Sequence, residues 1–361
     1  MKKLAVLISI MVLLGLLAGM LSCGAPAKPE GTITLTEVAW AGSGPTASSY
    51  LSAIAVGQIL EKYTDIGSTA VAGTIAERFG MFASGQVQFV HGYGDQGYKA
   101  SRNLPEFDEA TKGYKIPYTH AFAQYQYWNA TWVRQDAGIK SFADLPGKKF
   151  IWDYPTSAWY ANRFKVIAEM YGFNPDDVIK FESSGARKTD IFTVVEGRAA
   201  GSWGGMVHPG DADVMEAFET ADMDMIGFES IERAQEFCDH PLVKSMGFVP
   251  GIMEAGGYKG FDHDVITVGT PNGWGVHKDL DTDLVYTITK TLYEHSDEVA
   301  EIYGPAGAGF QEQLISWDNA PYHPGVIKLA KEKGIWTKEK EAQQKKNLSE
   351  AWYYPDEWLW D

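Results

Sequence analysis

Cysteine and metal-binding patterns are nearly absent from this chain. Its 361 residues include two cysteines, so the sequence offers no disulfide framework, and Cys238 is predicted to be a buried, inert thiol. The eight histidines form no His-x-x-x-His pair, and no Gly-x-Ser-x-Gly motif marks a serine hydrolase. We therefore predict no catalytic residue, no bound metal and no cofactor.

Basic residues are also under-represented. Lysine and arginine total 31 against 47 aspartates and glutamates, which gives a formal net charge of -16. A surface this acidic argues against nucleic acid as a partner and against binding of the folded part to anionic lipid. It does not exclude an anionic ligand, because the N-terminus of a helix attracts anions locally.

Long apolar runs are confined to the N-terminus, where Lys2 and Lys3 precede the unbroken run 4–21. Residues 1–22 are therefore predicted to be an export signal. Residues 20–23 resemble a lipobox, in which Cys23 is lipidated and anchors the protein. Cleavage after the small residues at 25–27 would instead release a soluble protein, and an uncleaved anchor is a third possibility. All three place the folded part outside the cytoplasm.

The remaining length suggests a short linker (23–30) and two lobes. The first lobe is predicted to be discontinuous, with residues 31–133 and 266–361, and the second to span 134–265. Strands and helices alternate, which predicts an α/β fold with parallel sheets. Strands are expected at 32–38, 67–72, 87–90, 121–134 and 265–268, and helices after residue 50, from 75 to Gly85, at 162–171 and at 326–348. The aromatic C-terminal tail is expected to pack against the body.

The segment 41–50 is the strongest functional signal. A Gly/Ser/Thr loop follows a strand and leads into a helix, whose exposed N–H groups can bind a carboxylate. The alternative is that Thr46 or Ser48 only caps the helix, as Thr74 is expected to cap the next one.

Two other motifs are interpreted as structural. The segment 92–97 matches Gly-x-Gly-x-x-Gly, but no acidic residue follows at the required place, so we predict a loop and no dinucleotide site. The segment 319–325 is predicted to be a rigid turn in which Gly325 supplies an unusual dihedral angle.

In order along the chain, several segments resemble the TAXI-type solute-binding proteins of TRAP transporters, which have the type II periplasmic-binding fold. These segments are 42–50, 73–74, 83–88, 139–149, 195–198, 283–290 and 322–325. The resemblance implies two parallel-sheet lobes joined by hinge strands, with a ligand cleft between them. It also implies an extracytoplasmic binding protein, not an enzyme, that delivers a small organic acid to the TRAP membrane permease subunits.

On this resemblance the ligand is expected among residues of both lobes: Ser43, Thr46, Ser48, Ser49, Tyr50, Gly73 and Thr74 from the first, and Thr156, Ser157 and Trp159 from the second. Arg187 or Arg78 is a candidate carboxylate clamp, with a surface salt bridge as the alternative. Trp203 and Trp274 are candidate stacking walls, with core packing as the alternative.

The chain departs from the family at two loops. Ser48-Ser49-Tyr50-Leu51 stands where a Gly-Thr-Tyr-Tyr sequence is usual, and the second-lobe loop 153–159 is bulkier and carries Asp153. Glutamate-like and dicarboxylate ligands are usual in the family. These departures favour a flatter, more apolar acid, or one with an amine facing Asp153.

Three other functions remain open. The first is a binding protein of the same fold for an ABC importer, and the second is a lipoprotein that presents ligand to a membrane sensor. The third is an exported hydrolase, which would turn its ligand over. A binding protein returns its ligand unchanged.

Overall fold

The computed structural model describes residues 36–45, 47–153, 158–184, 187–203, 206–207, 212–307 and 310–353. The predicted export signal, Cys23 and the linker lie outside these residues, as do Thr46, Thr156 and Ser157. The side chain of Trp159 is also not described.

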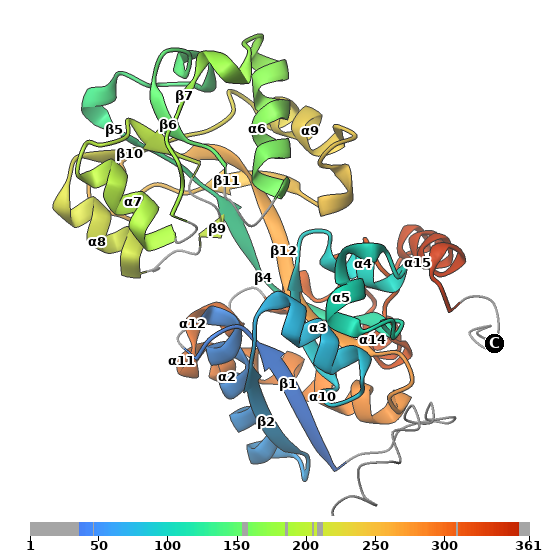
Figure 1. Cartoon of the computed structure of the whole chain (residues 1–361). Helices are drawn as coiled ribbons and strands as arrows, with labels where there is room; N and C mark the ends of the chain where they lie inside the picture. The colour runs from blue at the N-terminus through green and yellow to red at the C-terminus, as the bar shows by residue number, and fades with distance from the viewer. Residues whose placement is uncertain are drawn as a thin grey trace, which may run out of the picture. The chain divides into compact units, whose positions relative to one another are not determined.

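The described strands form two sheets (Figure 1). The first runs in the order β2 (Gly67–Ala72), β1 (Glu37–Gly42), β3 (Phe89–Tyr93), β12 (Val265–His277), β4 (Tyr118–Asn129) and β9 (Met206–Val207), with β11 (Val249–Met253) also paired to β12. The second runs β10 (Met223–Ile226), β5 (Thr131–Arg134), β8 (Gly201–Ser202), β6 (Lys149–Ile151) and β7 (Ile179–Lys180). The predicted α/β class with two sheets is confirmed.

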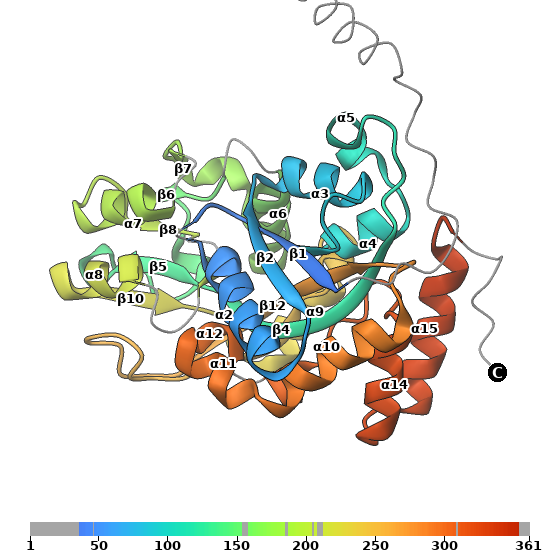
Figure 2. The same cartoon turned by 90° about the horizontal axis from the view of Figure 1, so that it is seen from below.

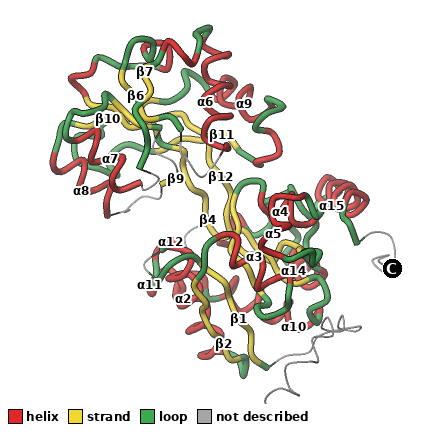
Figure 3. Tube along the Cα trace, in the orientation of Figure 1, coloured by secondary structure: helices red, strands yellow, loops and turns green. Residues whose placement is uncertain are grey.

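Helices follow most of the strands along the chain (Figure 3). Those that follow strands of the first sheet or close the chain are α2 (Ser48–Tyr63), α3 (Ile75–Ala83), α4 (Gln96–Ser101), α5 (Asp108–Thr111), α10 (Thr282–Glu294), α11 (Ser296–Ile302), α12 (Gly304–Gly307), α13 (Phe310–Gln313), α14 (Pro324–Glu332) and α15 (Lys338–Glu350). Those between β6 and β11 are α6 (Ala158–Tyr171), α7 (Arg187–Val195), α8 (Ala212–Thr220) and α9 (Ile231–Asp239). Short 3-10 turns occur at η1 (Pro105–Phe107), η2 (Gln135–Ala137), η3 (Phe142–Asp144), η4 (Pro175–Asp177) and η5 (Lys244–Met246).

The sheets are mixed, which corrects the prediction of parallel sheets. β1 is parallel to β2 and β3, but β12 runs antiparallel to β3 and to β4. In the second sheet β6 is parallel to β7 and β8, whereas β5 is antiparallel to its neighbours. The antiparallel strands are the ones by which the chain leaves and re-enters the first sheet, a connection that local sequence patterns do not reveal.

Local sequence signals correctly predicted the bounds of β2 and the two ends of α3. β2 has the predicted bounds, and Thr74 caps α3 in a capping box with Glu77. Phe79 and Phe82 of α3 are buried, and Gly85 follows the helix at a φ of 76°. Glycine tolerates this left-handed conformation, so the helix ends there.

Other boundaries differ from the predictions. β1 extends through Gly42, so the loop before α2 is shorter than expected, and β3 begins at Phe89. The predicted strand 121–134 is two strands, β4 and β5, separated at Ala130. The predicted helix 326–348 is interrupted, because Gly334 has a φ of 70° between α14 and α15.

Aromatic side chains form the centre of the first sheet. Trp40 stacks on Phe89 with ring centroids 3.9 Å apart, and Trp274 meets Trp40 edge-on at 5.1 Å. Each such pair contributes about 0.5–1.5 kcal/mol beyond its area burial. Trp352 and Tyr353, at the start of the C-terminal tail, donate to the carbonyls of Ile116 and Tyr118, so the tail packs back as predicted as far as it is described.

Four histidines are buried with the first sheet and its helices. Burial lowers the pKa of His91, His120 and His323 to about 3 and that of His277 to about 4. Each ring is hydrogen-bonded: His91 to Asn272, His120 to Asn319, and His323 to the carbonyl of Leu280, while the Nδ1 of His277 accepts the N–H of Asp279. These rings are therefore neutral in the folded protein at neutral pH.

These histidines predict acid sensitivity. The unfolded chain takes up protons below its histidine pKa of about 6.5, whereas the folded chain does not until pH about 4, so stability falls as the pH falls. Each histidine contributes a loss of up to about 1.4 kcal/mol per pH unit in this window. Urea unfolding at pH 7.5, 6.0 and 5.0 measures the effect. A free energy of unfolding that stays constant over this range would contradict the neutral, buried state.

Gly325 is required for packing, not for an unusual dihedral angle. It lies in the first turn of α14, and its φ is not positive. A Cβ there would lie 2.5 Å from the carbonyl oxygen of Thr282 and 2.6 Å from the backbone nitrogen of Tyr286. The glycine therefore lets α14 approach α10 closely, and the two helices lie side by side (Figure 2).

Gly325→Ala is expected to destabilise the protein by about 1–3 kcal/mol, because the added methyl group must push two helices apart. This lowers the thermal midpoint by several degrees. Gly257→Ala is the matched control, since nothing lies within 4 Å of a Cβ at that position. Equal midpoints for the two variants would show that α10 and α14 are not in close contact.

Candidate functional site

Three helices begin just after the three parallel strands of the first sheet end. β1 ends at Gly42, β2 at Ala72 and β3 at Tyr93, and α2, α3 and α4 follow. The carboxyl ends of parallel strands share one edge of a sheet, where ligands usually bind in α/β proteins. The N-termini of α2 and α3, both longer than two turns, point backbone N–H groups and positive dipole ends toward this edge.

The loop before α2 is held in place by Ser49. Its hydroxyl accepts the Ser43 N–H at 2.9 Å, and the residue is 3 % exposed. Gly42 allows this turn, because a Cβ there would lie 2.8 Å from the Cα of Tyr50. Ser48 and Tyr50 are half-buried beside it. Ser43, Ser48, Ser49 and Tyr50 thus lie at one turn, and that they bind a ligand stays a prediction.

The expected helix cap is different. The residue before the first turn of α2 is Ala47, whose side chain makes no capping hydrogen bond, and Ser48 is already helical. The prediction that Ser48 caps α2 is therefore wrong, and Thr46 lies outside the described residues. Among the described residues, Ala47 therefore provides no side-chain acceptor to the first N–H groups of α2.

Gly73 and Thr74 lie next to this loop. The Gly73 N–H donates to the carbonyl of Gly42 at 3.0 Å, which ties the end of β2 to the end of β1. The Thr74 hydroxyl accepts the Glu77 N–H at 3.3 Å, and the Glu77 carboxylate accepts the Thr74 N–H at 2.8 Å. Thr74 therefore has a structural role as a cap, whatever else it contacts.

In the second sheet, the start of α6 occupies the corresponding place after β6. Tyr160, in its first turn, is half-buried, and burial raises its pKa to about 12. The charges of Arg163, Arg187 and Asp190 and the phenol of Tyr93 also act on it. Tyr160 thus responds electrostatically to Tyr93, at the end of β3 in the first sheet, and to Arg187, at the start of α7, which precedes β8 of the second sheet.

Arg187 already holds a carboxylate. Its Nε and Nη2 donate to the two oxygens of Asp213 at 2.9 and 2.7 Å, and its side chain is 31 % exposed. This is the bidentate geometry with which arginine binds a free carboxylate. Asp153, which was considered as a partner for a ligand amine, is 3.0 Å from the Nζ of Lys180 instead.

The two candidate stacking tryptophans lie in the core. Trp203 is 2 % exposed and lies among Phe142, Phe164 and Phe237. Trp274 is fully buried, and its Nε1 donates to the amide oxygen of Gln124 at 2.9 Å. Both tryptophans therefore pack in the core, which was the alternative to a stacking role. Arg78, the second candidate clamp, is fully buried in α3.

Arg163 was not identified from the sequence. It is fully buried in α6, and its Nη1 donates to the Oδ1 of Asn129 at 2.6 Å. Its guanidinium lies 4.9 Å from the ring centroid of Tyr160 and 4.8 Å from that of Trp203. The sequence did contain a signal for this residue, because Arg163 stands among the apolar positions of a helix. A charge at such a position needs a buried partner.

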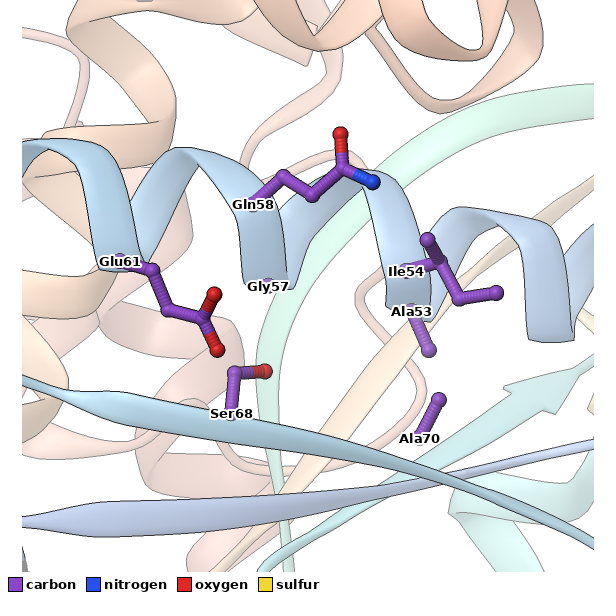
Figure 4. A pocket seen from close by; sticks show the side chains of 7 residues that line it. All are labelled: Ala53, Ile54, Gly57, Gln58, Glu61, Ser68 and Ala70. Atoms are coloured by element: carbon purple, nitrogen blue, oxygen red, sulfur yellow. The ribbon is translucent and has the colours of Figure 1, made fainter.

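Two pockets elsewhere contain none of the predicted site residues. The smaller, of about 200 Å³, lies between α2 and β2, with Glu61 beside Ser68 (Figure 4). It is smaller than most sites for organic ligands. The larger, of about 690 Å³, lies near α4, η5 and α15. Among the described residues, no group of three or more His, Cys, Asp or Glu side chains could hold a metal ion.

Residues 41–334 match the model of the NMT1-like family, which covers most of the chain, and the protein belongs to that family. The match runs from the end of β1 through α14 and therefore contains the predicted site residues. No helix in the described part of the chain is long and apolar enough to cross a membrane.

The chain is also similar to solved periplasmic binding proteins. The aliphatic sulphonate binding protein SsuA of Escherichia coli is 10% identical, with 86% of this chain and 92% of that chain covered and a TM-score of 0.44. A TctC solute binding protein from Polaromonas is 12% identical, with 75% and 88% covered and a TM-score of 0.46. YckB of Bacillus subtilis is 14% identical, with 78% and 93% covered and a TM-score of 0.45. Similarity at this level identifies no ligand.

The contact between Arg163 and Asn129 predicts a stability effect. Arg163→Met keeps much of the side-chain volume but leaves the buried Oδ1 of Asn129 without its donor, which costs about 1–3 kcal/mol. The matched control is Lys165→Met, since Lys165 is exposed on the same helix. Urea unfolding compares the two variants. If Arg163→Met unfolds at the same urea concentration as Lys165→Met, the hydrogen bond contributes nothing to the fold.

Proposed function

We propose that this NMT1-like protein is an extracytoplasmic solute-binding subunit that captures a small organic acid and delivers it to the membrane permease of a TRAP transporter. The observation that carries the proposal is the edge of the first sheet where β1, β2 and β3 end. There the loop at Ser43 and the N-termini of α2 and α3 meet, next to residues from the second sheet. No bond is made or broken in this function.

The site has the chemistry of a carboxylate receptor. Helix N-termini offer N–H donors and a positive potential, and Ser48 adds a hydroxyl at the start of α2. Arg187 offers a planar fork that binds one carboxylate at a time. In our proposal the ligand either replaces Asp213 on Arg187 or binds beside this pair.

Two lobes closing over the ligand would account for the division of the chain into two sheets. We place the first lobe at 31–133 and 266–361 and the second at 134–265, with closure about the strands between them. Separate buried clusters support this division, because one lies around Phe79, Phe82 and Tyr118 and another around Phe142, Phe164 and Trp203. Elements with their own cores move as rigid bodies about a hinge.

The ligand is proposed to be a flat, apolar acid. Tyr93 and Tyr160 supply aromatic side chains from the two sheets, and the second-lobe loop 153–159 is proposed to contribute Thr156, Ser157 and Trp159. Asp153 is engaged by Lys180, so an amine on the ligand would have to compete with an existing ion pair. An acid without an amine therefore suits this site better.

Export is part of the same proposal. Residues 1–22 are proposed to be a lipoprotein signal and Cys23 the lipidated residue, so that the protein meets its ligand outside the cytoplasm and stays near its permease. An ABC importer or a membrane sensor would be served by the same binding chemistry. A neighbouring gene for a large TRAP-type membrane subunit would favour the TRAP permease as the partner.

The test is thermal unfolding of the purified protein, stripped of bound ligand by unfolding and refolding, against amino acids, dicarboxylates, keto acids and aromatic acids. A ligand present at 100 times its dissociation constant stabilises the folded state by about 2.7 kcal/mol. The midpoint then rises by several degrees. The proposal requires such a shift with a carboxylic acid that is recovered unchanged. Conversion of the acid to a product would instead establish an enzyme.

The double variant Ser48→Ala/Ser49→Ala is expected to weaken binding of the acid found in this screen by about tenfold or more. It removes one hydroxyl at the helix start and the acceptor that positions the loop at Ser43, and each hydrogen bond is worth about 0.5–1.5 kcal/mol. Titration calorimetry measures the affinity. Ser349→Ala, on exposed α15, is the control. Unchanged affinity in the double variant would remove the first loop from the site.

A further inference from the structure

The pocket of about 690 Å³ lies outside the candidate site and is large enough for a small organic molecule. One wall comes from α4, which packs on β3 and β4, from the segment 316–319, where Trp317 stacks on His120 of β4, and from α15. The other wall comes from the segment 239–249, where Phe248 belongs to the same buried cluster as Trp203. None of the residues predicted for the organic-acid site lines it.

Its charges differ from those of the chain as a whole. The lining contains three cations (Arg102, Lys244 and Lys346) and three carboxylates (Asp239, Asp318 and Glu350), in a chain whose formal net charge is -16. The pocket is therefore much less acidic than the average surface, and an anion can approach it.

Several of these charges are already neutralised by neighbours. Arg102 pairs with Glu350 and also donates to the carbonyl of Asn319 at 3.1 Å, while Asp318 lies 2.6 Å from the Nζ of Lys340. Lys244 and Lys346 are exposed, and neither has an ion pair within the described part of the chain. The charges left for a ligand are thus two ammonium groups and the carboxylate of Asp239.

A buried hydrogen-bond donor lines the same pocket. Trp317 is 1 % exposed and stacks on His120 with ring centroids 4.4 Å apart. Its Nε1 has no acceptor among the described residues. Leaving such a donor unpaired is costly, which makes an acceptor from outside the chain favourable at this point.

Gly247 lies against this donor and leaves it uncovered by any side chain of its own. A Cβ on Gly247 would lie 3.8 Å from the Nε1 of Trp317, so the indole N–H is next to this glycine. Gly247 has a φ of 68°, a left-handed conformation that favours glycine over any residue with a side chain. The neighbouring Phe248 and Val249 and the ring of Tyr98 supply apolar surface.

We propose that this pocket is a second ligand site, which binds a small aromatic carboxylate. Lys244 and Lys346 attract the carboxylate group, Trp317 Nε1 donates to one of its oxygens, and the ring lies against the apolar surface beside Gly247. Because the walls belong to the cores of both sheets, an occupant contacts both parts of the molecule at once. This site is independent of the organic-acid site proposed above.

The test uses phenylacetate as the probe and the indole N–H signal of Trp317 in a ¹⁵N–¹H spectrum as the readout. Trp317→Phe, which keeps the stacked ring and removes the N–H, assigns the signal by its disappearance. The signal is expected to move saturably with phenylacetate, and at least about tenfold more weakly with the neutral amide phenylacetamide. A signal that does not move up to about 10 mM phenylacetate overturns the proposal.

The phenylacetate affinity of variants, measured by titration calorimetry, distinguishes this site from the organic-acid site. Lys244→Ala/Lys346→Ala is expected to weaken phenylacetate binding by about tenfold, whereas Lys345→Ala, on the same helix, is not. Lys345 is the matched control because it is exposed and lies 3.6 Å from Glu341. Equal affinities in the double variant and the control overturn the proposal. If Ser48→Ala/Ser49→Ala alone abolishes binding, phenylacetate occupies the organic-acid site, and the second site is refuted while the proposed function stands.

Discussion

Asn129 satisfies a set of buried hydrogen bonds on which the passage between the two sheets depends. Its Nδ2 donates to the Val268 carbonyl and to the Thr270 hydroxyl, both at 2.9 Å. Its backbone carbonyl accepts the Thr267 hydroxyl at 2.8 Å. Its Oδ1 accepts from Arg163. One side chain therefore joins the last residue of β4, the strand β12 and the helix α6. Each of these groups would be costly to leave unpaired.

This junction determines where the candidate site can lie. Arg163 brings α6 to the end of β4, and α6 carries Tyr160 in its first turn. Tyr160 in turn lies near Tyr93 at the end of β3 and near Arg187 at the start of α7. The edge of the first sheet, with its helix N-termini, thus has aromatic and cationic side chains of the second sheet close to it, as an acid-binding site requires.

The sequence predicted elements with strong local signals and missed features that depend on distant partners. Thr74 and Gly85 mark the two ends of α3 by local backbone chemistry, and these two predictions were confirmed. The antiparallel direction of β12 and the burial of Arg163 depend on residues far along the chain. Gly325 shows the same limit, because the reason for the glycine is the backbone of α10 and not its own φ. In the site, the grouping of Ser43, Ser49 and Gly73 was predicted, whereas the engagement of Arg187 by Asp213 required the fold.

Native mass spectrometry of the stripped protein tests the central claim most directly, with Lys244→Ala/Lys346→Ala as the background that weakens the second site and an equimolar set of organic acids as ligands. The account predicts one bound molecule per chain whose mass equals that of an unaltered acid, and loss of this complex in Ser48→Ala/Ser49→Ala but not in Ser349→Ala. A complex that persists unchanged in the double variant would contradict the assigned site. A bound mass different from every acid supplied would contradict the assignment as a binding protein.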